Sequence, residues 1–270
     1  LWKKFTFKKI DISKHEPLEK IFKKNKFSYV INLAAQAGVR TSIQDPRPYI
    51  ESNVVGFFNL LELSRKFKIK HLLFASTSSV YGNNNTFPSK ENFNTDEPLS
   101  FYAATKKSNE IMAFSYSHIY KLPCTALRFF TVYGPLGRPD MAIYKFTDNI
   151  ANGRKIDLYN KGDHVRDFTF IDDVVMYVIK LLKKAPKKAI PYDVYNIGNS
   201  KPKKLIHFLN IIEKHLSLKA NVNLKKMQLG DVHTTYSNNK KIIKKTNYLP
   251  KVTIDKGISK FVEWYRAFYK

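Results

Sequence analysis

Residues 71–82 read HLLFASTSSVYG, so an apolar run of strand length leads directly into a cluster of small hydroxyl side chains and a glycine. Two other stretches also lead from a short apolar run toward a glycine: residues 29–38 (YVINLAAQAG) and residues 124–135 (CTALRFFTVYGP). Short apolar runs of this kind are typical of strands that are buried on both faces of a parallel sheet. These three stretches therefore predict the sheet on which the rest of the fold is built.

Segments with helical patterns separate these strands. We expect helices near residues 16–24, 48–67, 102–120, 142–152, 172–184 and 258–268, and additional strands at residues 5–11 and 193–197. Strands that alternate with helices imply parallel crossover connections, which predicts the α/β fold class with a doubly wound parallel sheet. In such sheets a ligand binds beyond the carboxyl ends of the strands, so we expect the chemistry to lie just after residues 33, 76 and 130.

Composition excludes several classes of protein. The chain has 270 residues, of which 43% are hydrophobic, so it can bury a core and is not expected to be disordered. Its single cysteine, Cys124, excludes a disulfide scaffold and an all-cysteine metal site, and fits a reducing, cytoplasmic location. The histidines show no metal-ligand spacing with acids, so we expect no metal. No apolar run is long enough to cross a bilayer, so we expect no membrane partner.

The net charge is +25, from 47 basic and 22 acidic residues, which raises the possibility of a nucleic-acid partner. However, most of the basic residues are lysines spread along the whole chain, whereas proteins that read bases usually rely on arginine forks. We therefore expect no nucleic acid partner. The positive field would still attract a small polyanionic substrate.

Tyr102 and Lys106 form a Y-x-x-x-K pattern at the start of an expected helix. Positions i and i+4 share one helix face, so the lysine ammonium can lie beside the tyrosine hydroxyl and lower its pKa toward the working range of a general base. A half-buried tyrosine beside a surface lysine is the simpler alternative. The hydroxyls of residues 77–79, at the end of a strand, favour the chemical interpretation because they could hold a substrate oxygen that faces the same tyrosine.

Together these motifs resemble the extended short-chain dehydrogenase/reductase group, and within it the NAD-dependent sugar-nucleotide epimerases, with the UDP-glucuronate 4-epimerases most similar. The resemblance covers essentially the whole chain. It rests on the hydroxyl run before Val80, the Tyr102/Lys106 pair, residues 32–35 (NLAA), residues 128–135 (RFFTVYGP), and residues 165–168 (VRDF) with the following 171–173 (IDD).

The resemblance implies a role for individual residues. Tyr102 would be the base, Lys106 would tune it and reach the nicotinamide ribose, and Thr77 and Ser78 would hold the substrate oxygen. The residues expected to line NAD, besides Tyr102 and Lys106, are Asp11, Ile12, Leu33, Ala34, Ala35, Gln36, Asn53 and Ser76. Those expected to bind the UDP-sugar, besides Thr77, are Thr131, Arg138, Tyr159, Arg166, Gln228 and Asp231.

Several of these assignments have a simpler structural alternative. The alternatives are a cap near a helix for Asp11, a local bond inside a helix for Asn53, an ion pair with Asp140 for Arg138, ordinary strand packing for Tyr159, and a salt bridge with Asp167 for Arg166.

The resemblance also implies a Gly-rich G-x-x-G-x-x-G turn near the start of the chain, where the pyrophosphate would bind a helix N-terminus. None of the ten glycines forms that turn, and the first residue is Leu1. We therefore expect the N-terminal βαβ unit of the Rossmann-like domain, about 50 residues at ordinary element lengths, to be missing. The chain would then be a fragment, with residues 1–138 and 165–198 forming the NAD-binding domain and the remainder of 139–270 a smaller substrate subdomain.

The activity that the resemblance implies is epimerisation at carbon 4 of a UDP-sugar through a transient 4-keto intermediate. The expected conversion is UDP-glucuronate to UDP-galacturonate, a step in the synthesis of polysaccharide precursors. Related dehydratases and decarboxylases carry acids next to the threonine, whereas Thr77 is followed by Ser78 and Ser79. The alternatives are a UDP-glucose 4-epimerase or another epimerase of a neutral sugar, and an inactive fragment that lacks the NAD turn. The family commonly dimerises through two helices, here residues 48–67 and 102–120, so we expect a homodimer.

Overall fold

A computed structural model describes residues 4–228 and 230–269 of the chain. The backbone divides into two compact units. Unit 1 comprises Leu1–Ser76, Ser100–Ala126 and Ala185–Asp193, and unit 2 comprises Thr77–Leu99, Leu127–Lys184 and Val194–Lys270. The division expected at residue 138 separates a part that would bind NAD from a part that would bind the substrate. That division stays a prediction.

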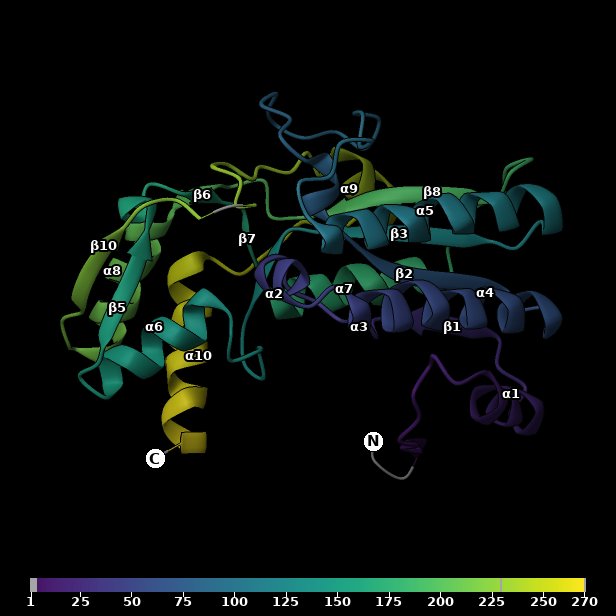
Figure 1. Cartoon of the computed structure of the whole chain (residues 1–270), viewed down its shortest axis with the longest axis horizontal. Coiled ribbons are helices and arrows are strands. Elements are labelled where there is room, and N and C mark those ends of the chain that lie inside the picture. The colour runs from purple at the N-terminus through teal and green to yellow at the C-terminus, as the bar shows by residue number, and fades with distance from the viewer. Residues whose placement is uncertain (1–3, 229, 270) are drawn as a thin grey trace. The chain divides into compact units, whose positions relative to one another are not determined.

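The main sheet has the strand order β1-β2-β3-β8 among the described residues (Figure 1). Its strands are β1 (Tyr29–Asn32), β2 (His71–Thr77), β3 (Cys124–Phe129) and β8 (Tyr192–Ile197). β1 and β2 run parallel, with Tyr29 opposite His71. β2 is buried along almost its whole length, as its continuous apolar run predicts. The expected α/β fold with a parallel sheet is confirmed.

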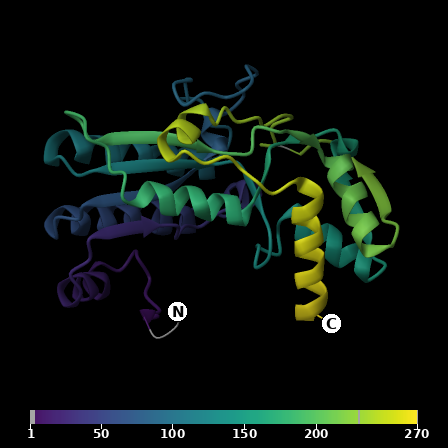
Figure 2. The same ribbon diagram turned by 180° about the vertical axis from the view of Figure 1, so that it is seen from behind.

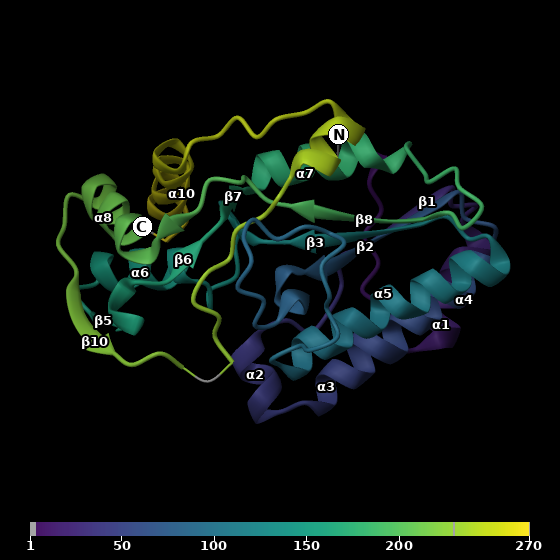
Figure 3. The ribbon, with the colours of Figure 1, turned by 90° about the horizontal axis from the view of Figure 1, so that it is seen from above.

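Unit 1 surrounds its strands with helical segments. They are α1 (His15–Lys24), α2 (Val39–Gln44), α3 (Arg47–Tyr49), the π-helical segment η2 (Ile50–Val55), α4 (Gly56–Lys66) and α5 (Phe101–Tyr120). α4 and α5 lie side by side along the sheet (Figure 3). α5 begins at a capping residue, because Ser100 Oγ accepts a hydrogen bond from Ala103 N at 3.2 Å. Capping fixes the first turn of α5, which carries Tyr102.

The expected strand at residues 5–11 does not form, and this segment runs as coil into α1 (Figure 1). Its aromatic side chains Phe5 and Phe7 are 60% and 75% exposed. A strand needs a neighbour that takes up its backbone hydrogen bonds, and none of the described strands pairs with this segment. The apolar pattern of residues 5–11 alone is therefore not sufficient to form a strand.

Two other expected elements are interrupted. The helix expected from 48 to 67 contains the π-helical turn η2 between α3 and α4. The strand expected to end at residue 130 stops at Phe129, and the chain continues as a separate strand, β4 (Thr131–Tyr133). Cys124, at the start of β3, is fully buried, and burial raises the pKa of its thiol to about 12.

Unit 2 contains three small strand pairs. β4 runs parallel to β7 (Phe168–Phe170), β5 (Lys155–Tyr159) runs parallel to β10 (Asn221–Lys225), and β6 (Val165–Arg166) runs antiparallel to β9 (Lys203–Lys204). The helical segments of this unit are η3 (Ser78–Tyr81), α6 (Ala142–Ala151), η4 (Asn160–Gly162), α7 (Ile171–Leu182), α8 (Leu205–Leu216), α9 (Lys240–Thr246) and α10 (Ile254–Tyr269). Among the helices of the described chain, none is both long and apolar enough to cross a membrane.

The core of unit 2 lies where α8 packs against α6 and α10 (Figure 2). Phe208 of α8 stacks on Phe168, with ring centroids 4.0 Å apart and planes 9° apart. The same ring meets Tyr133 edge-on at 5.7 Å. These contacts join α8 to the strand pair β4–β7, which leads toward several of the expected substrate residues.

We expect Phe208→Ala to lower the free energy of unfolding by about 3–5 kcal/mol, because it opens a cavity among aromatic rings. The matched control is Leu224→Ala, whose side chain is 59% exposed and should change stability by no more than about 0.5 kcal/mol. Urea denaturation followed by circular dichroism measures both. A loss below about 1 kcal/mol for Phe208→Ala would contradict this account of the core.

Candidate active site

Tyr102 and Lys106 lie one turn apart on α5, as their spacing predicts. The Lys106 side chain is only 2% exposed, and among the described residues no hydrogen bond or ion pair reaches its ammonium group. Burial lowers the pKa of Lys106 to about 8. Tyr102 is half-buried, and its ring packs edge-on against Tyr49 with centroids 6.2 Å apart. The alternative of a surface lysine is therefore wrong.

The same face of α5 carries Glu110, four residues beyond Lys106. Glu110 is buried and accepts a hydrogen bond from Ser76 Oγ at 2.6 Å. Ser76 is the last residue of β2 in unit 1, directly before Thr77. This hydrogen bond ties the end of β2 to the helix that bears Tyr102 and Lys106.

Asn53, in the π-helical segment η2, joins the segment after β1 to α5. Its Oδ1 accepts from Gln36 N at 2.7 Å, and its Nδ2 donates to Gln36 O at 2.9 Å and to Thr105 Oγ1 at 3.0 Å. Asn109 Nδ2 donates to the carbonyl of Asn53 at 2.6 Å. These bonds are long-range, so the alternative of a local bond inside a helix does not hold. π-helical turns occur often at functional sites.

The residues directly after β1 are exposed or half-buried. Leu33 is 59% exposed, Ala34 is also exposed, and Ala35 and Gln36 are half-buried. The turn that follows is held by Tyr49, whose hydroxyl donates to Gly38 O at 2.7 Å. Gly38 has φ +118°, a conformation that L side chains rarely adopt.

Asp11 and Ile12 precede α1 in unit 1. Asp11 is exposed, and its Oδ1 accepts from Ser13 N at 2.9 Å, which lowers the pKa of this carboxyl. The expected alternative of a helix cap is not found, because the N-cap of α1 is Lys14 and no side chain caps it. A role of Asp11 in cofactor binding stays a prediction. The Ile12 carbonyl accepts from Asn59 Nδ2 at 3.0 Å, so α4 fixes the backbone of this segment.

These features of unit 1 fit the nicotinamide riboside portion of NAD. The Lys106 ammonium meets no acceptor in the described chain, and a ligand with hydroxyl acceptors would satisfy its donors. Lys106 would hold the ribose, and residues 33–36, of which Leu33 and Ala34 are exposed, would lie along the cofactor.

Thr77 and Ser78 belong to unit 2, where they open the short helix η3. Thr77 Oγ1 accepts from Ser79 N at 3.2 Å and caps this turn. The Tyr81 hydroxyl donates a hydrogen bond to Asn196 Oδ1 at 2.6 Å. The Arg128 guanidinium carbon lies over the Tyr81 ring, 4.9 Å from the ring centroid. The hydroxyl cluster is thus a capped turn held by buried polar contacts.

Arg138 is exposed and forms a two-point ion pair with Asp140. The distances are 3.0 Å from Nε to Oδ1 and 2.8 Å from Nη2 to Oδ2. This is the structural alternative expected from the sequence. Thr131, which starts β4, is half-buried, and its backbone N donates to Asp167 O at 3.2 Å. The substrate roles of both residues stay predictions.

Arg166 lies on β6 beside the segment that carries Gln228 and Asp231. Its Nη1 donates to His233 O at 2.9 Å, and Asp231 N donates to Gln228 O at 3.3 Å. The expected alternative of a salt bridge with Asp167 is wrong, because that carboxylate is occupied by other donors. In the described part of the chain, the buried Gln228 Oε1 has no hydrogen-bond partner, which fits a ligand-binding amide. Tyr159 is half-buried at the end of β5.

The sequence analysis does not single out four residues that hold this site together: Tyr49, Thr105, Asn109 and Glu110. Glu110 could have been found, since it continues the i, i+4 series of Tyr102 and Lys106. The others depend on contacts with segments far away in sequence, which no local pattern announces. Within the described residues no group of three or more His, Cys, Asp or Glu side chains could hold a metal ion.

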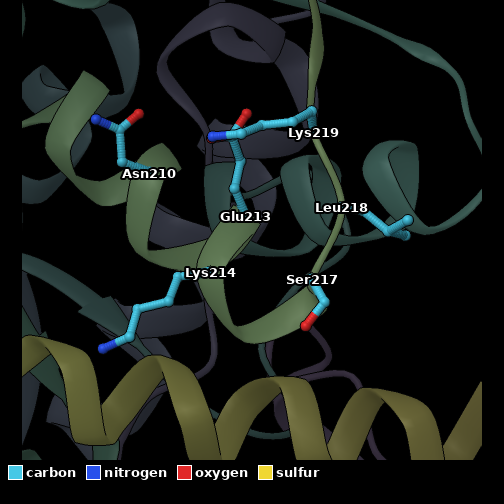
Figure 4. A pocket seen from close by; sticks show the side chains of 6 residues that line it. All are labelled: Asn210, Glu213, Lys214, Ser217, Leu218 and Lys219. Atoms are coloured by element: carbon cyan, nitrogen blue, oxygen red, sulfur yellow. The ribbon is translucent and has the colours of Figure 1, made fainter.

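Figure 4 shows a shallow hollow at the end of α8, lined by Asn210, Glu213, Lys214, Ser217, Leu218 and Lys219. None of the expected site residues lines it. Glu213 is already engaged by Ala220 N at 2.8 Å and by the Lys219 ammonium at 2.9 Å. We assign no function to this hollow.

Residues 1–261 match the protein family described as GDP-mannose 4,6 dehydratase. The chain belongs to this family. A probable UDP-glucuronate 4-epimerase of Rhizobium meliloti is 46% identical over 256 residues, which cover 89% of this chain and 75% of that protein. The recognition of this chain as a sugar-nucleotide epimerase of the short-chain dehydrogenase/reductase type is confirmed.

Two solved structures of such epimerases resemble the dehydratase-family fold of this chain. The UDP-glucose 4-epimerase of Thermotoga maritima, solved with UDP-glucose, gives a TM-score of 0.93 at 28% identity and covers 99% of this chain and 86% of its own. The UDP-glucuronic acid 4-epimerase of Bacillus cereus, solved with UDP-glucuronic acid and NAD, gives a TM-score of 0.91 at 31% identity. The match covers 98% of this chain and 82% of that one.

The buried Lys106 makes a prediction about stability and pH. Because its pKa is about 8 in the folded chain and near 10.5 when exposed, the unfolded chain holds the extra proton between these values. The free energy of unfolding should therefore rise as the pH increases from about 8 to 10.5. Lys106→Met should be more stable than the wild type at pH 7, and this advantage should fade toward pH 10.5.

Lys107→Met is the matched control, because its half-buried side chain is the helix neighbour of Lys106. The difference in free energy of unfolding between Lys107→Met and the wild type should not fade between about pH 8 and 10.5 as it does for Lys106→Met. Denaturation midpoints between pH 7 and 10.5 measure all three proteins. Parallel pH curves for the wild type and Lys106→Met would contradict the burial of a charged lysine.

Proposed function

We propose that this protein interconverts UDP-glucuronate and UDP-galacturonate by epimerisation at carbon 4. The enzyme class and the use of NAD, both predicted from the sequence, are confirmed by the related nucleotide-sugar 4-epimerases and their NAD complexes. The finer statement, glucuronate as the sugar, is our proposal. The observation that carries the chemistry is the buried side chain of Lys106, one helical turn from Tyr102.

In this proposal Tyr102 takes the proton from the 4-hydroxyl of the sugar. A nearby cation stabilises the phenolate, and the low exposure of Lys106 strengthens that effect because water screens it less. NAD, when bound, would accept the hydride from carbon 4 and give it back to the same carbon. Tyr102 then returns the proton to the oxygen of the product.

Thr77 and Ser78 hold the sugar oxygen during this exchange. The Thr77 hydroxyl is already oriented by Ser79 at the start of η3, so it presents a fixed group to a substrate. The residues that follow Thr77 are serines, not acids. Dehydration needs an additional acid or base, so the absence of a carboxylate at these two positions supports epimerisation although the family carries the name of a dehydratase.

Arg138 is the proposed partner of the sugar carboxylate, because a guanidinium matches a carboxylate at two points. A neutral sugar such as glucose is the second candidate. It is favoured by the ion pair in which Asp140 already occupies the Nε and Nη2 edge of the Arg138 guanidinium. The pair is exposed, and exposed ion pairs contribute only about 0–1 kcal/mol, so a substrate carboxylate could replace Asp140.

Unit 2 would bind the nucleotide part. Arg166 is the proposed ligand of the diphosphate, Gln228 and Asp231 approach the nucleotide, and Tyr159 flanks the uracil ring. The fixed position of the Arg166 guanidinium beside the His233 carbonyl supports this assignment, since a preoriented fork loses less entropy on binding.

We also propose that the protein forms a homodimer. Apolar side chains lie exposed on α4 and α5, among them Phe58, Ile111, Phe114 and Ile119. An exposed apolar patch of this kind is typical of an interface. A cytoplasmic location stays a prediction.

We expect Tyr102→Phe to lower the turnover of UDP-glucuronate by about a hundredfold or more, because the phenyl ring cannot exchange a proton. Binding of NAD and UDP-sugar, measured by calorimetry, should persist. The matched control is Tyr120→Phe, at the other end of the same helix, which should keep its turnover. Near wild-type turnover in Tyr102→Phe would show that another group is the base.

We expect Arg138→Ala to lower kcat/KM for UDP-glucuronate while changing that for UDP-glucose much less. One charge-assisted pair contributes about 1.5–3 kcal/mol, which corresponds to roughly a tenfold to hundredfold change. Arg138→Lys should recover only part, because it lacks the fork. Arg154→Ala, which removes another exposed arginine paired with an aspartate, is the control. Equal losses on both sugars after Arg138→Ala would mean that Arg138 serves the loop or the diphosphate, and the glucuronate proposal would lose its main support.

A further inference from the structure

Asp167 lies between β6 and β7, next to Arg166, and its side chain is fully buried. Its carboxylate accepts hydrogen bonds from two distant segments. Asn199 N and Ser200 N donate to it at 3.1 Å each, and Ser237 N donates at 2.9 Å. The Ser237 hydroxyl also donates to Asp167 Oδ2. A buried carboxylate is tolerated only where donors surround it in this way.

The two segments also hold each other. Ser200 Oγ donates to Ser237 O at 2.7 Å, and Asn239 Nδ2 donates to Gly198 O at 3.1 Å. A Cβ atom on Gly198 would lie 2.0 Å from Ser237 Oγ and 3.0 Å from Asp167 Oδ2. The approach of residues 198–200 to residues 237–239 therefore requires a glycine, and the carboxylate sits where they meet.

The anchored segment in turn directs Arg166. Asp167 N donates to Thr235 Oγ1 at 3.3 Å, and Thr235 N donates to Val165 O at 3.0 Å. Two residues earlier, the His233 carbonyl accepts from Val165 N at 3.0 Å and from Arg166 Nη1 at 2.9 Å. The guanidinium is thus aimed by a carbonyl on the segment that the Asp167 carboxylate anchors.

We propose that Asp167 is a positioning residue for the nucleotide diphosphate: its carboxylate fixes residues 233–237 against β6 and thereby sets the direction of the Arg166 guanidinium. This inference rests on the proposed role of Arg166 in binding the diphosphate. The Asp167 side chain is fully buried and is therefore not open to a ligand. Its effect reaches the ligand through the His233 carbonyl, so its loss should change nucleotide affinity beyond any change in stability.

The test compares Asp167→Asn with a matched control, Asp173→Asn. Asp173 lies on α7 in the same unit, is 1% exposed, and accepts from Tyr248 OH at 2.6 Å, Lys251 N at 2.9 Å and Val252 N at 3.1 Å. It makes no hydrogen bond to residues 228–239 of the described chain. Both variants should lower the melting temperature, since each puts an amide NH₂ among donors.

The deciding measurement is the Kd for UDP, by calorimetry at a temperature where every protein is folded. Asp167→Asn should weaken UDP binding by at least about tenfold, equivalent to about 1.4 kcal/mol, and Asp173→Asn by less than about twofold. Ser237→Ala removes one donor and keeps the carboxylate, so it should fold and show a smaller loss in the same direction. This variant keeps the test decisive if Asp167→Asn does not fold.

A double-mutant cycle then tests the route through Arg166. In an Arg166→Ala background, Asp167→Asn should cause almost no additional loss of UDP affinity. Equal losses in both backgrounds, or equal effects of Asp167→Asn and Asp173→Asn on UDP affinity, would overturn the inference. A wild-type protein that fails to bind UDP at all would instead contradict the proposed function, so the two failures are distinguishable.

Discussion

The candidate chemistry of unit 1 depends on Lys106, whose side chain is almost fully buried and whose ammonium has no hydrogen-bond partner among the described residues. Such burial is unfavourable by itself, so the surrounding structure must hold α5 in place. It does so at three points along the helix. Ser100 caps the first turn, Asn109 bonds to the backbone of η2, and Glu110 bonds to the end of β2. A helix held in this way presents its basic group in one fixed direction, which is what preorganised catalysis requires.

The parts of this arrangement that follow local rules could be predicted from sequence. Short apolar runs predict buried strands. The i, i+4 spacing of Tyr102 and Lys106 places both on one face if the segment is helical. The burial of a polar side chain by distant segments could not be predicted in this way. Lys106 is one example, and Asn53, which is hydrogen-bonded to Gln36 and Thr105, is another. Residues 5–11 show the converse: a strand-like pattern stays coil where no described strand pairs with it.

Unit 2 was harder to predict because its site elements are too short to leave a periodic signal. β6 and β9 have two residues each, and the segment from Gln228 to Ser237 is held by side-chain and backbone hydrogen bonds outside regular structure. Arg166 could be singled out through resemblance, but the absence of a pair with the adjacent Asp167 could not. For Arg138 the neighbouring acid was sufficient, since Asp140 lies within reach along the same loop.

The buried thiol at the start of β3 has a practical consequence. Thiol reagents attack the thiolate, and Cys124 is both enclosed and held in its protonated form, so the folded chain should behave toward them as if it contained no cysteine. Because it is the single cysteine in the sequence, a cysteine introduced on the surface would be the sole reactive position. Fluorescent or spin labels could then be attached at chosen points on either unit without first replacing a native residue. The distance between the units in solution would thereby become directly measurable.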